Sequence, residues 1–161
     1  MADLHTERLI LHPITTDEAE RMIARQPGPQ DAWADDFPFD GELIAATMFL
    51  RATIALGDQQ PFGHYVIIRT ADGLAVGGTG FKSQPSNGTV EIGYGLAPSA
   101  RGKGFAAEAA RALVELAGEQ GILRVVADTD MGNTASQQTL ENAGFTNTGI
   151  DGDLLLYERI T

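Results

Sequence analysis

Residues 90–110, VEIGYGLAPSARGKGFAAEAA, constrain the fold of this chain more than any other stretch. Apolar residues alternate with polar or small ones up to Leu96, which predicts a strand with one apolar face. The opposite face carries Glu91 followed by two glycines, and glycine inside a strand often marks a place where a ligand approaches the main chain. Pro98 ends the strand, so a turn must follow it.

The turn after this strand, Arg101-Gly102-Lys103-Gly104-Phe105-Ala106, opens a predicted helix that runs to about Gln120. The first N–H groups of a helix have no partner inside it, and the positive end of the helix dipole lies there. Two flanking cations and several small residues complete a predicted phosphate site. An apolar strand follows at residues 122–127, so this strand–helix–strand unit should be a right-handed parallel crossover.

The rest of the chain alternates between strand and helix patterns separated by clear turn signals. We expect strands at residues 4–14, 62–70, 74–82, 145–150 and 154–160, and helices from Thr15 or Thr16 to about Gln26, from about 41 to 56, and from Asn133 to Gly144. The two strands before residue 90 form an antiparallel meander with the central strand. The fold class is therefore α/β (α+β), with a mixed, mostly antiparallel sheet of about seven strands flanked by about four helices.

Composition limits the kinds of function that the chain can have. A length of 161 residues predicts a single domain over residues 1–161, and the absence of cysteine excludes disulfides and thiolate sites. A net charge of −11 argues against nucleic acid as a partner and is compatible with a cationic substrate. We find no membrane segment or export leader, which predicts a cytoplasmic protein, and no histidine at metal-ligand spacing, so no metal is expected.

An acidic, aromatic segment lies between the first two predicted helices. Residues 26–50 contain no Lys or Arg, and they include Trp33, Asp35, Asp36 and Phe37. These four residues could form a substrate wall in which carboxylates attract a protonated amine. The alternative is a solvated loop that its aromatic residues pin to the core.

Four blocks, in this order, resemble the GNAT superfamily of acyl-CoA-dependent N-acetyltransferases. The blocks are Thr6-Glu7-Arg8-Leu9-Ile10-Leu11, Glu91-Ile92-Gly93-Tyr94 with Pro98, Arg101 to Ala106, and Asn133-x-x-Ser136 with Leu140 and Gly144-Phe145. The first block resembles the RimJ/RimL-type branch, which acetylates the N-termini of ribosomal proteins. The resemblance implies a GNAT fold in which acetyl-CoA enters where two central parallel strands splay apart.

The resemblance also implies direct transfer of the acetyl group from acetyl-CoA to a primary amine. Glu91 would be the catalytic base, with a pKa raised by burial. The alternative is that Glu91 is an ordinary polar residue of the strand or only orients the substrate. The main-chain N–H of Leu96 would stabilise the oxyanion. The residues implied to bind the co-substrate are Leu96, Arg101, Gly102, Lys103, Gly104, Phe105, Ala106 and Asn133. The acceptor is a small-molecule amine or a protein N-terminus, and family habit makes a homodimer plausible.

The usual proton donor to the leaving thiolate is absent from this sequence. Many GNAT members use a tyrosine at the position that Leu140 occupies here. Ser136 lies one turn earlier on the same helix face, so we expect it to be a catalytic residue on the sulfur side. The alternatives are that the thiolate leaves unassisted and that Ser136 only packs or caps.

Two alternatives stay open. A non-catalytic acetyl-CoA-binding protein could have the same fold, because fold does not determine function. A nucleotide-binding oxidoreductase would use the G-x-G-x-x-A pattern that begins at Gly102, with Asp128 or Asp130 as the partner of an NAD(P) ribose.

Overall fold

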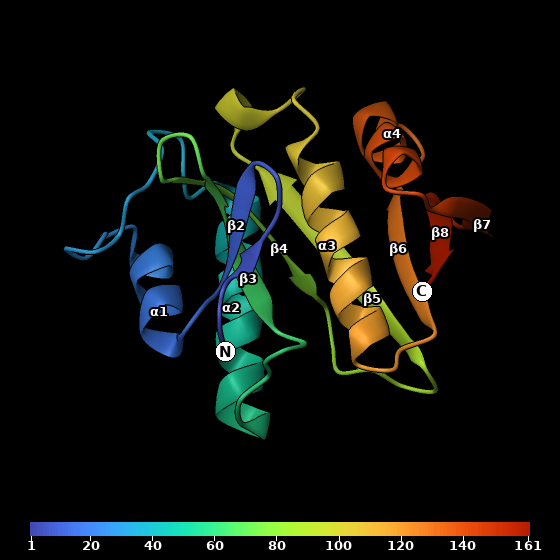
Figure 1. The fold of residues 1–161 in the computed structure, drawn as a ribbon, viewed down its shortest axis with the longest axis horizontal. Helices are drawn as coiled ribbons and strands as arrows, with labels where there is room; N and C mark the ends of the chain where they lie inside the picture. The colour runs from blue at the N-terminus through green and yellow to red at the C-terminus, as the bar shows by residue number, and fades with distance from the viewer.

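The computed structural model describes residues 1–161 and contains one eight-stranded sheet with the strand order β1-β2-β3-β4-β5-β6-β8-β7 (Figure 1). The strands are β1 (Leu4–His5), β2 (Leu9–Pro13), β3 (His64–Arg69), β4 (Leu74–Phe81), β5 (Thr89–Leu96), β6 (Arg124–Asp130), β7 (Thr146–Asp151) and β8 (Leu154–Ile160). The helices are α1 (Thr16–Ala24), α2 (Asp40–Leu56), α3 (Phe105–Glu119) and α4 (Thr134–Asn142), and a 3-10 turn (Pro98–Ala100) precedes α3. None of these helices is both long and apolar enough to cross a membrane.

The predicted fold class is confirmed. β3, β4 and β5 form the antiparallel meander, and β5 and β6 are parallel neighbours joined through α3. The alternative of a doubly wound sheet for NAD(P) is wrong, because β5 and β6 are the one parallel pair in the sheet.

The first predicted strand needs a correction. The chain turns between His5 and Leu9, where the N–H of Thr6 donates to the carbonyl of Leu9, 2.9 Å away. The strand is therefore split into β1 and β2, which pair with each other in antiparallel fashion. This split raises the strand number from the expected seven or so to eight.

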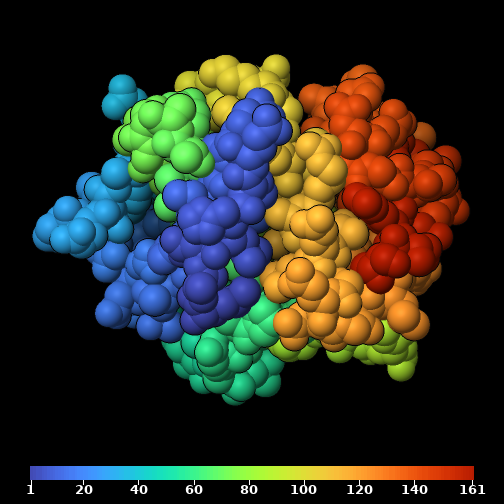
Figure 2. Space-filling view, in the orientation of Figure 1, coloured from blue at the N-terminus to red at the C-terminus, as the bar shows by residue number.

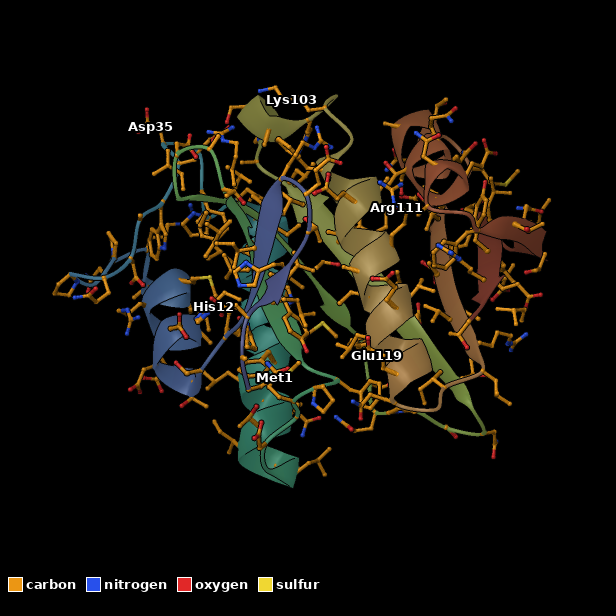
Figure 3. The ribbon with its side chains drawn as sticks, viewed as in Figure 1. Met1, His12, Asp35, Lys103, Arg111 and Glu119 are labelled. Atoms are coloured by element: carbon orange, nitrogen blue, oxygen red, sulfur yellow. The ribbon has the colours of Figure 1, made fainter.

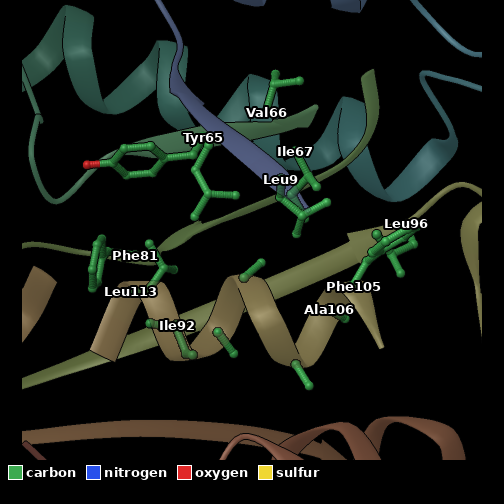
Figure 4. Packing of buried hydrophobic residues seen from close by; sticks show 14 of the residues in the cluster. Leu9, Tyr65, Val66, Ile67, Phe81, Ile92, Leu96, Phe105, Ala106 and Leu113 are labelled. Carbon is green, nitrogen blue, oxygen red and sulfur yellow. The ribbon is translucent and has the colours of Figure 1, made fainter. Parts of the chain in front are cut away.

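The helices cover the sheet in two layers. α3 and α4 lie on one face, in front of the sheet in Figure 1, whereas α2 lies behind the sheet and α1 packs against α2. Figure 4 shows the core between α3 and the sheet, where Leu113 and Phe105 of α3 face Leu9, Ile67 and Ile92 of the strands. The alanines at 106, 107, 109, 110 and 117 of α3 are buried, and these small side chains let the helix pack close to the sheet.

The N-terminal turn packs directly beside α3, as the space-filling view shows (Figure 2). Arg8 Nε donates to Glu108 Oε1 at 2.8 Å, and the Thr6 hydroxyl donates to the other oxygen of the same carboxylate. Arg8 Nη1 also donates to the Lys103 carbonyl at 2.8 Å. Its guanidinium lies 4.6 Å from the centre of the Phe105 ring. The opening block of the sequence therefore holds the start of α3 in place.

β5 and β6 separate part of the way along their length. They pair at three positions only, and the last of these joins Glu91 to Val126. β5 continues to pair with β4 as far as Leu96, and β6 continues to pair with β8 as far as Asp130. Each of the two strands therefore has an open edge that faces the other.

Candidate functional site

The open edge of β5 presents main-chain groups to the gap between the strands. The Ala97 N–H donates to the Val76 carbonyl of β4 at 2.8 Å, and the Lys82 N–H donates to the Glu91 carbonyl at 2.9 Å. Main-chain groups of alternate residues point in opposite directions, so those of Tyr94 and Leu96 point away from β4. The Leu96 N–H, predicted as an oxyanion donor, therefore lies on the open edge.

The loop 101–107 lies at the end of this edge, where Lys103 is labelled in Figure 3. Gly102 and Gly104 have φ angles of 77° and 82°, values that L side chains rarely adopt. No side chain caps α3, and the N–H groups of residues 102–107 have no hydrogen-bond partner in the protein. Arg101 Nε donates to the Leu96 carbonyl at 3.2 Å, which ties the loop to the open edge of β5. These features form a cradle that an anion fits.

Not every residue predicted to bind phosphate has a free side chain. Phe105 and Ala106 are buried, so they can contribute only their main-chain N–H groups. Lys103 is exposed, and its ammonium reaches back to the Ser99 carbonyl at 3.3 Å. The cations that could meet a phosphate are therefore Arg101 and Lys103.

The sheet face opposite α3 carries glycines on the two neighbouring strands β4 and β5, and we call it the glycine face. Gly78 of β4 lies opposite Gly95 of β5, and Gly80 lies opposite Gly93. A Cβ atom at Gly95 would lie 3.1 Å from the ring of Phe39, so this aromatic side chain covers that end of the glycine face.

Glu91 lies on the same face, at the point where β5 and β6 separate. Its carboxylate is 3.3 Å from the ammonium of Lys82, which is also 4.0 Å from Asp128 of β6. The Glu91 side chain is 35% exposed, so it is less buried than the sequence analysis expects. Two carboxylates and one cation thus flank the glycines, an arrangement that suits a charged, polar substrate.

The acidic, aromatic segment is pinned to the sheet. The Ala34 N–H donates to the Ala75 carbonyl, which makes Trp33 part of a short bridge to β4. Phe37 is buried, with its ring centre 5.7 Å from that of Trp33. Phe37 therefore supports the segment from inside and has little surface to offer a substrate.

The two carboxylates of this segment differ. Asp36 accepts from both the N–H and the hydroxyl of Ser99, each at 2.8 Å, and these bonds lower its pKa. It links the segment to the turn before the loop 101–107 and is not free to attract a substrate. Asp35 is exposed, at the same end of the molecule as Lys103 (Figure 3).

Ser136 lies on the other side of β5, near the open edge. Its hydroxyl is 2.6 Å from that of Tyr94, so strand and helix are joined across the gap. Burial raises the pKa of Tyr94, which favours the protonated phenol. Leu140 is fully buried, and the Asn133 side chain accepts from the Ser136 N–H at 3.1 Å as the cap of α4.

Sequence reasoning missed several residues that the structure places around β5. Tyr94 belongs to the apolar face of the predicted strand, although a buried tyrosine hydroxyl usually has a polar partner. The sequence also did not predict which side chains fill the space over the glycine face, namely those of Phe39, Glu42, His64 and Lys82. The glycines of β4 were a usable signal, because they leave room for side chains from other elements. No group of three or more His, Cys, Asp or Glu side chains is placed to hold a metal ion.

Comparisons with known proteins agree with this geometry. Residues 8–146 match the model of the acetyltransferase (GNAT) domain. The chain is 38% identical over 86 residues to the uncharacterized N-acetyltransferase YjdG of Bacillus subtilis (strain 168), a match that covers 52% of this chain and 51% of YjdG.

Solved structures share the fold over nearly the full length. An acetyltransferase from Agrobacterium tumefaciens has a TM-score of 0.69 and 26% identity, covering 99% of this chain and 94% of that one. RimL, a ribosomal L7/L12 alpha-N-protein acetyltransferase in complex with coenzyme A, has a TM-score of 0.71 and 20% identity, covering 99% and 98%. Since the family model spans most of the sequence and the sheet opens between β5 and β6, this chain belongs to the GNAT family of acetyltransferases.

Proposed function

We propose that the chain transfers the acetyl group of acetyl-CoA directly to a primary amine, either a protein N-terminal α-amine or the amine of a small molecule. The observation that carries the proposal is the open edge of β5, which ends at the unpartnered N–H groups of residues 102–107. The pyrophosphate would bind this cradle, and the pantetheine arm would pair with the open edge as an added strand does. The coenzyme A bound to RimL supports this assignment.

Each side of β5 would then serve one substrate. Arg101 and Lys103 neutralise the phosphates of acetyl-CoA, Asn133 contacts its arm, and the Leu96 N–H donates to the developing oxyanion. On the glycine face, Glu91 attracts the acceptor ammonium and is the first candidate to take its proton.

The hydroxyl pair of Ser136 and Tyr94 replaces the absent tyrosine of α4 in this proposal. Its two oxygens are 2.6 Å apart beside the open edge, so one hydroxyl can pass a proton to the other. The pair can therefore donate a proton to the leaving thiolate, while the attacking nitrogen loses one as the amide forms. The opening block of the sequence favours the RimJ/RimL-type branch, whose acceptors are protein N-termini.

Thermal unfolding with acetyl-CoA, CoA, NAD and NADP tests the donor. A ligand at 100 times its dissociation constant stabilises a protein by about 2.7 kcal/mol, a shift of several degrees for a domain of this size. We expect a shift with the two CoA species alone. A shift with NAD or NADP alone, or no shift with any ligand, would overturn the proposal.

Thiol release from acetyl-CoA then tests the acceptor. The panel should contain peptides that begin with Ser or Ala, free amino acids, spermidine and an aminoglycoside. Turnover with any of these amines supports the enzyme, and replacing Glu91→Gln should then reduce turnover while CoA binding persists. A chain that binds CoA and releases no thiol with any amine would favour the non-catalytic alternative.

A further inference from the structure

A buried histidine–glutamate pair outside the predicted site lies against the glycine face. His64, the first residue of β3, has its Nε2 atom 2.6 Å from Oε1 of Glu42 in the first turn of α2. The two residues are 9% and 2% exposed. Burying a carboxylate and an imidazole is costly unless they are paired, so their position calls for an explanation beyond core packing.

The glycines of β4 make room for this pair. The Glu42 carboxylate occupies the space that a Cβ atom at Gly78 would take. The His64 Nδ1 atom lies 3.0 Å from the position of a Cβ at Gly80. Any larger residue at these two positions would push the pair out of its place.

The sheet register aligns His64 with Gly93 of β5. His64 lies opposite Gly80 on β4, and Gly80 lies opposite Gly93 on β5. The three residues therefore form one row across the sheet, and no side chain projects from its middle. The row ends at Gly93. Glu91 lies two residues before Gly93 on β5, and the open edge of β5 starts after Glu91.

The two imidazole nitrogens have different environments. Nε2 faces a carboxylate, so it carries a hydrogen and donates it to Glu42. Nδ1 has no partner in the protein, although every fully buried side-chain nitrogen or oxygen of the chain has one. Nδ1 therefore reaches solvent on the glycine face, and in the neutral ring it holds a free lone pair.

We propose that His64, oriented by Glu42, is a second proton-accepting residue for the amine substrate. The proposal rests on the proposed function, since it concerns the same reaction. The acceptor ammonium, drawn in by Glu91, gives one proton to His64 Nδ1, and Glu42 stabilises the imidazolium that forms. The free amine attacks the thioester carbonyl, the C–N bond forms, the C–S bond breaks, and the thiolate takes the second amine proton through Ser136 and Tyr94. His64 then releases its proton to water.

The kinetic test compares His64→Gln with a matched variant. His12 also pairs with a glutamate, Glu18, at 2.8 Å, but it lies on β2 beside α1 and away from the glycine row. With acetyl-CoA and the most reactive amine of the panel, His64→Gln should lose kcat by about a hundredfold, the usual range for general base catalysis. His12→Gln should keep kcat within about threefold, and acetyl-CoA affinity should be unchanged in both.

A rescue experiment separates proton transfer from a purely structural role. Free imidazole should restore part of the activity of His64→Ala, because it can fill the space that the ring leaves. A folded, CoA-binding His64→Gln variant with kcat within about threefold of the wild type would overturn the proposal, since a catalytic base contributes far more.

An NMR measurement tests the inference without any acceptor amine. In protein with 15N-labelled histidine, the neutral His64 ring should show a hydrogen on Nε2 and a bare Nδ1, and Glu42→Gln should change that pattern. A His64 ring with its hydrogen on Nδ1 alone would contradict this inference. Lack of turnover with every amine would instead contradict the proposed function.

Discussion

The two sides of β5 are built in different ways. The proposed donor side, with the open edge and the loop 101–107, presents main-chain N–H groups from one continuous stretch of sequence. The glycine face presents side chains from separate elements, with Glu42 from α2, His64 from β3 and Lys82 from the end of β4. Main-chain groups are present whatever the side chains are, so they suit a co-substrate phosphate that does not vary. Side chains differ with the sequence, so they can be adapted to different acceptor amines.

The largest effect should come from disturbing the glycine face. Replacing Gly78→Ala puts a methyl group where the Glu42 carboxylate lies. Because leaving a buried carboxylate without its partner costs roughly 3–5 kcal/mol, we expect a loss of about 3 kcal/mol in the free energy of unfolding. Chemical denaturation measures this loss. Gly93→Ala is the control, since its Cβ would meet only the flexible Lys82 side chain at 3.1 Å, and an equal loss there would contradict the reasoning.

The hydroxyl pair on the donor side should control departure of the thiolate. Tyr94→Phe removes the phenol that lies 2.6 Å from the Ser136 hydroxyl. A hydrogen bond to a charged group is worth about 1.5–3 kcal/mol, so kcat should fall by roughly tenfold to a hundredfold with unchanged acetyl-CoA affinity. Steady-state kinetics with a saturating amine measures the change. If Tyr94→Phe keeps full kcat while Ser136→Ala loses it, Ser136 acts without Tyr94.

The main-chain cradle should tolerate little change in its conformation. Gly104→Ala places a side chain at a φ angle of 82°, which costs about 1–2 kcal/mol, and its Cβ would lie 3.4 Å from Nη2 of Arg8. We expect acetyl-CoA affinity to fall by about tenfold, which calorimetry measures. Gly73→Ala introduces the same kind of strain at φ 72° in open space at the turn between β3 and β4. It should reduce stability without changing CoA affinity, and a similar affinity loss there would show that strain alone is responsible.

The smallest effect concerns the ion pair of His12 and Glu18, which lies away from His64 and the glycines opposite it. The hydrogen bond to Glu18 raises the pKa of His12 to about 9. Because the folded pKa lies above that of the unfolded chain, the pair contributes fully below about pH 6.5, and its contribution disappears as the pH rises to about 9. Since both side chains are partly exposed, we expect the wild type to lose about 1 kcal/mol across this window.

Thermal unfolding of His12→Gln between pH 6 and pH 9.5 measures this contribution. The variant should lack the decline that the wild type shows, whereas His5→Gln, at an exposed position on β1, should keep it. A decline that persists in His12→Gln would assign the pH dependence to other groups.

Local patterns in the sequence determined most of the fold and the loop 101–107. The alternation before Leu96, the stop at Pro98 and the small residues from Gly102 onward act on neighbouring residues, so they can be interpreted without knowing the rest of the chain. The positions of nearly all helices and strands followed for the same reason. The break between β1 and β2 was missed because a turn centred on ordinary residues has no glycine or proline to mark it.

Only the tertiary structure decided how the other side of β5 is occupied. Strand register places Gly78 beside Gly95, and packing of α2 on that face then brings Glu42 to His64, 22 residues away in the sequence. Tertiary packing likewise brings Asp36 into contact with Ser99 and Tyr94 into contact with Ser136. A single sequence contains the residue types but not these pairings, because distances between remote side chains depend on how whole elements pack.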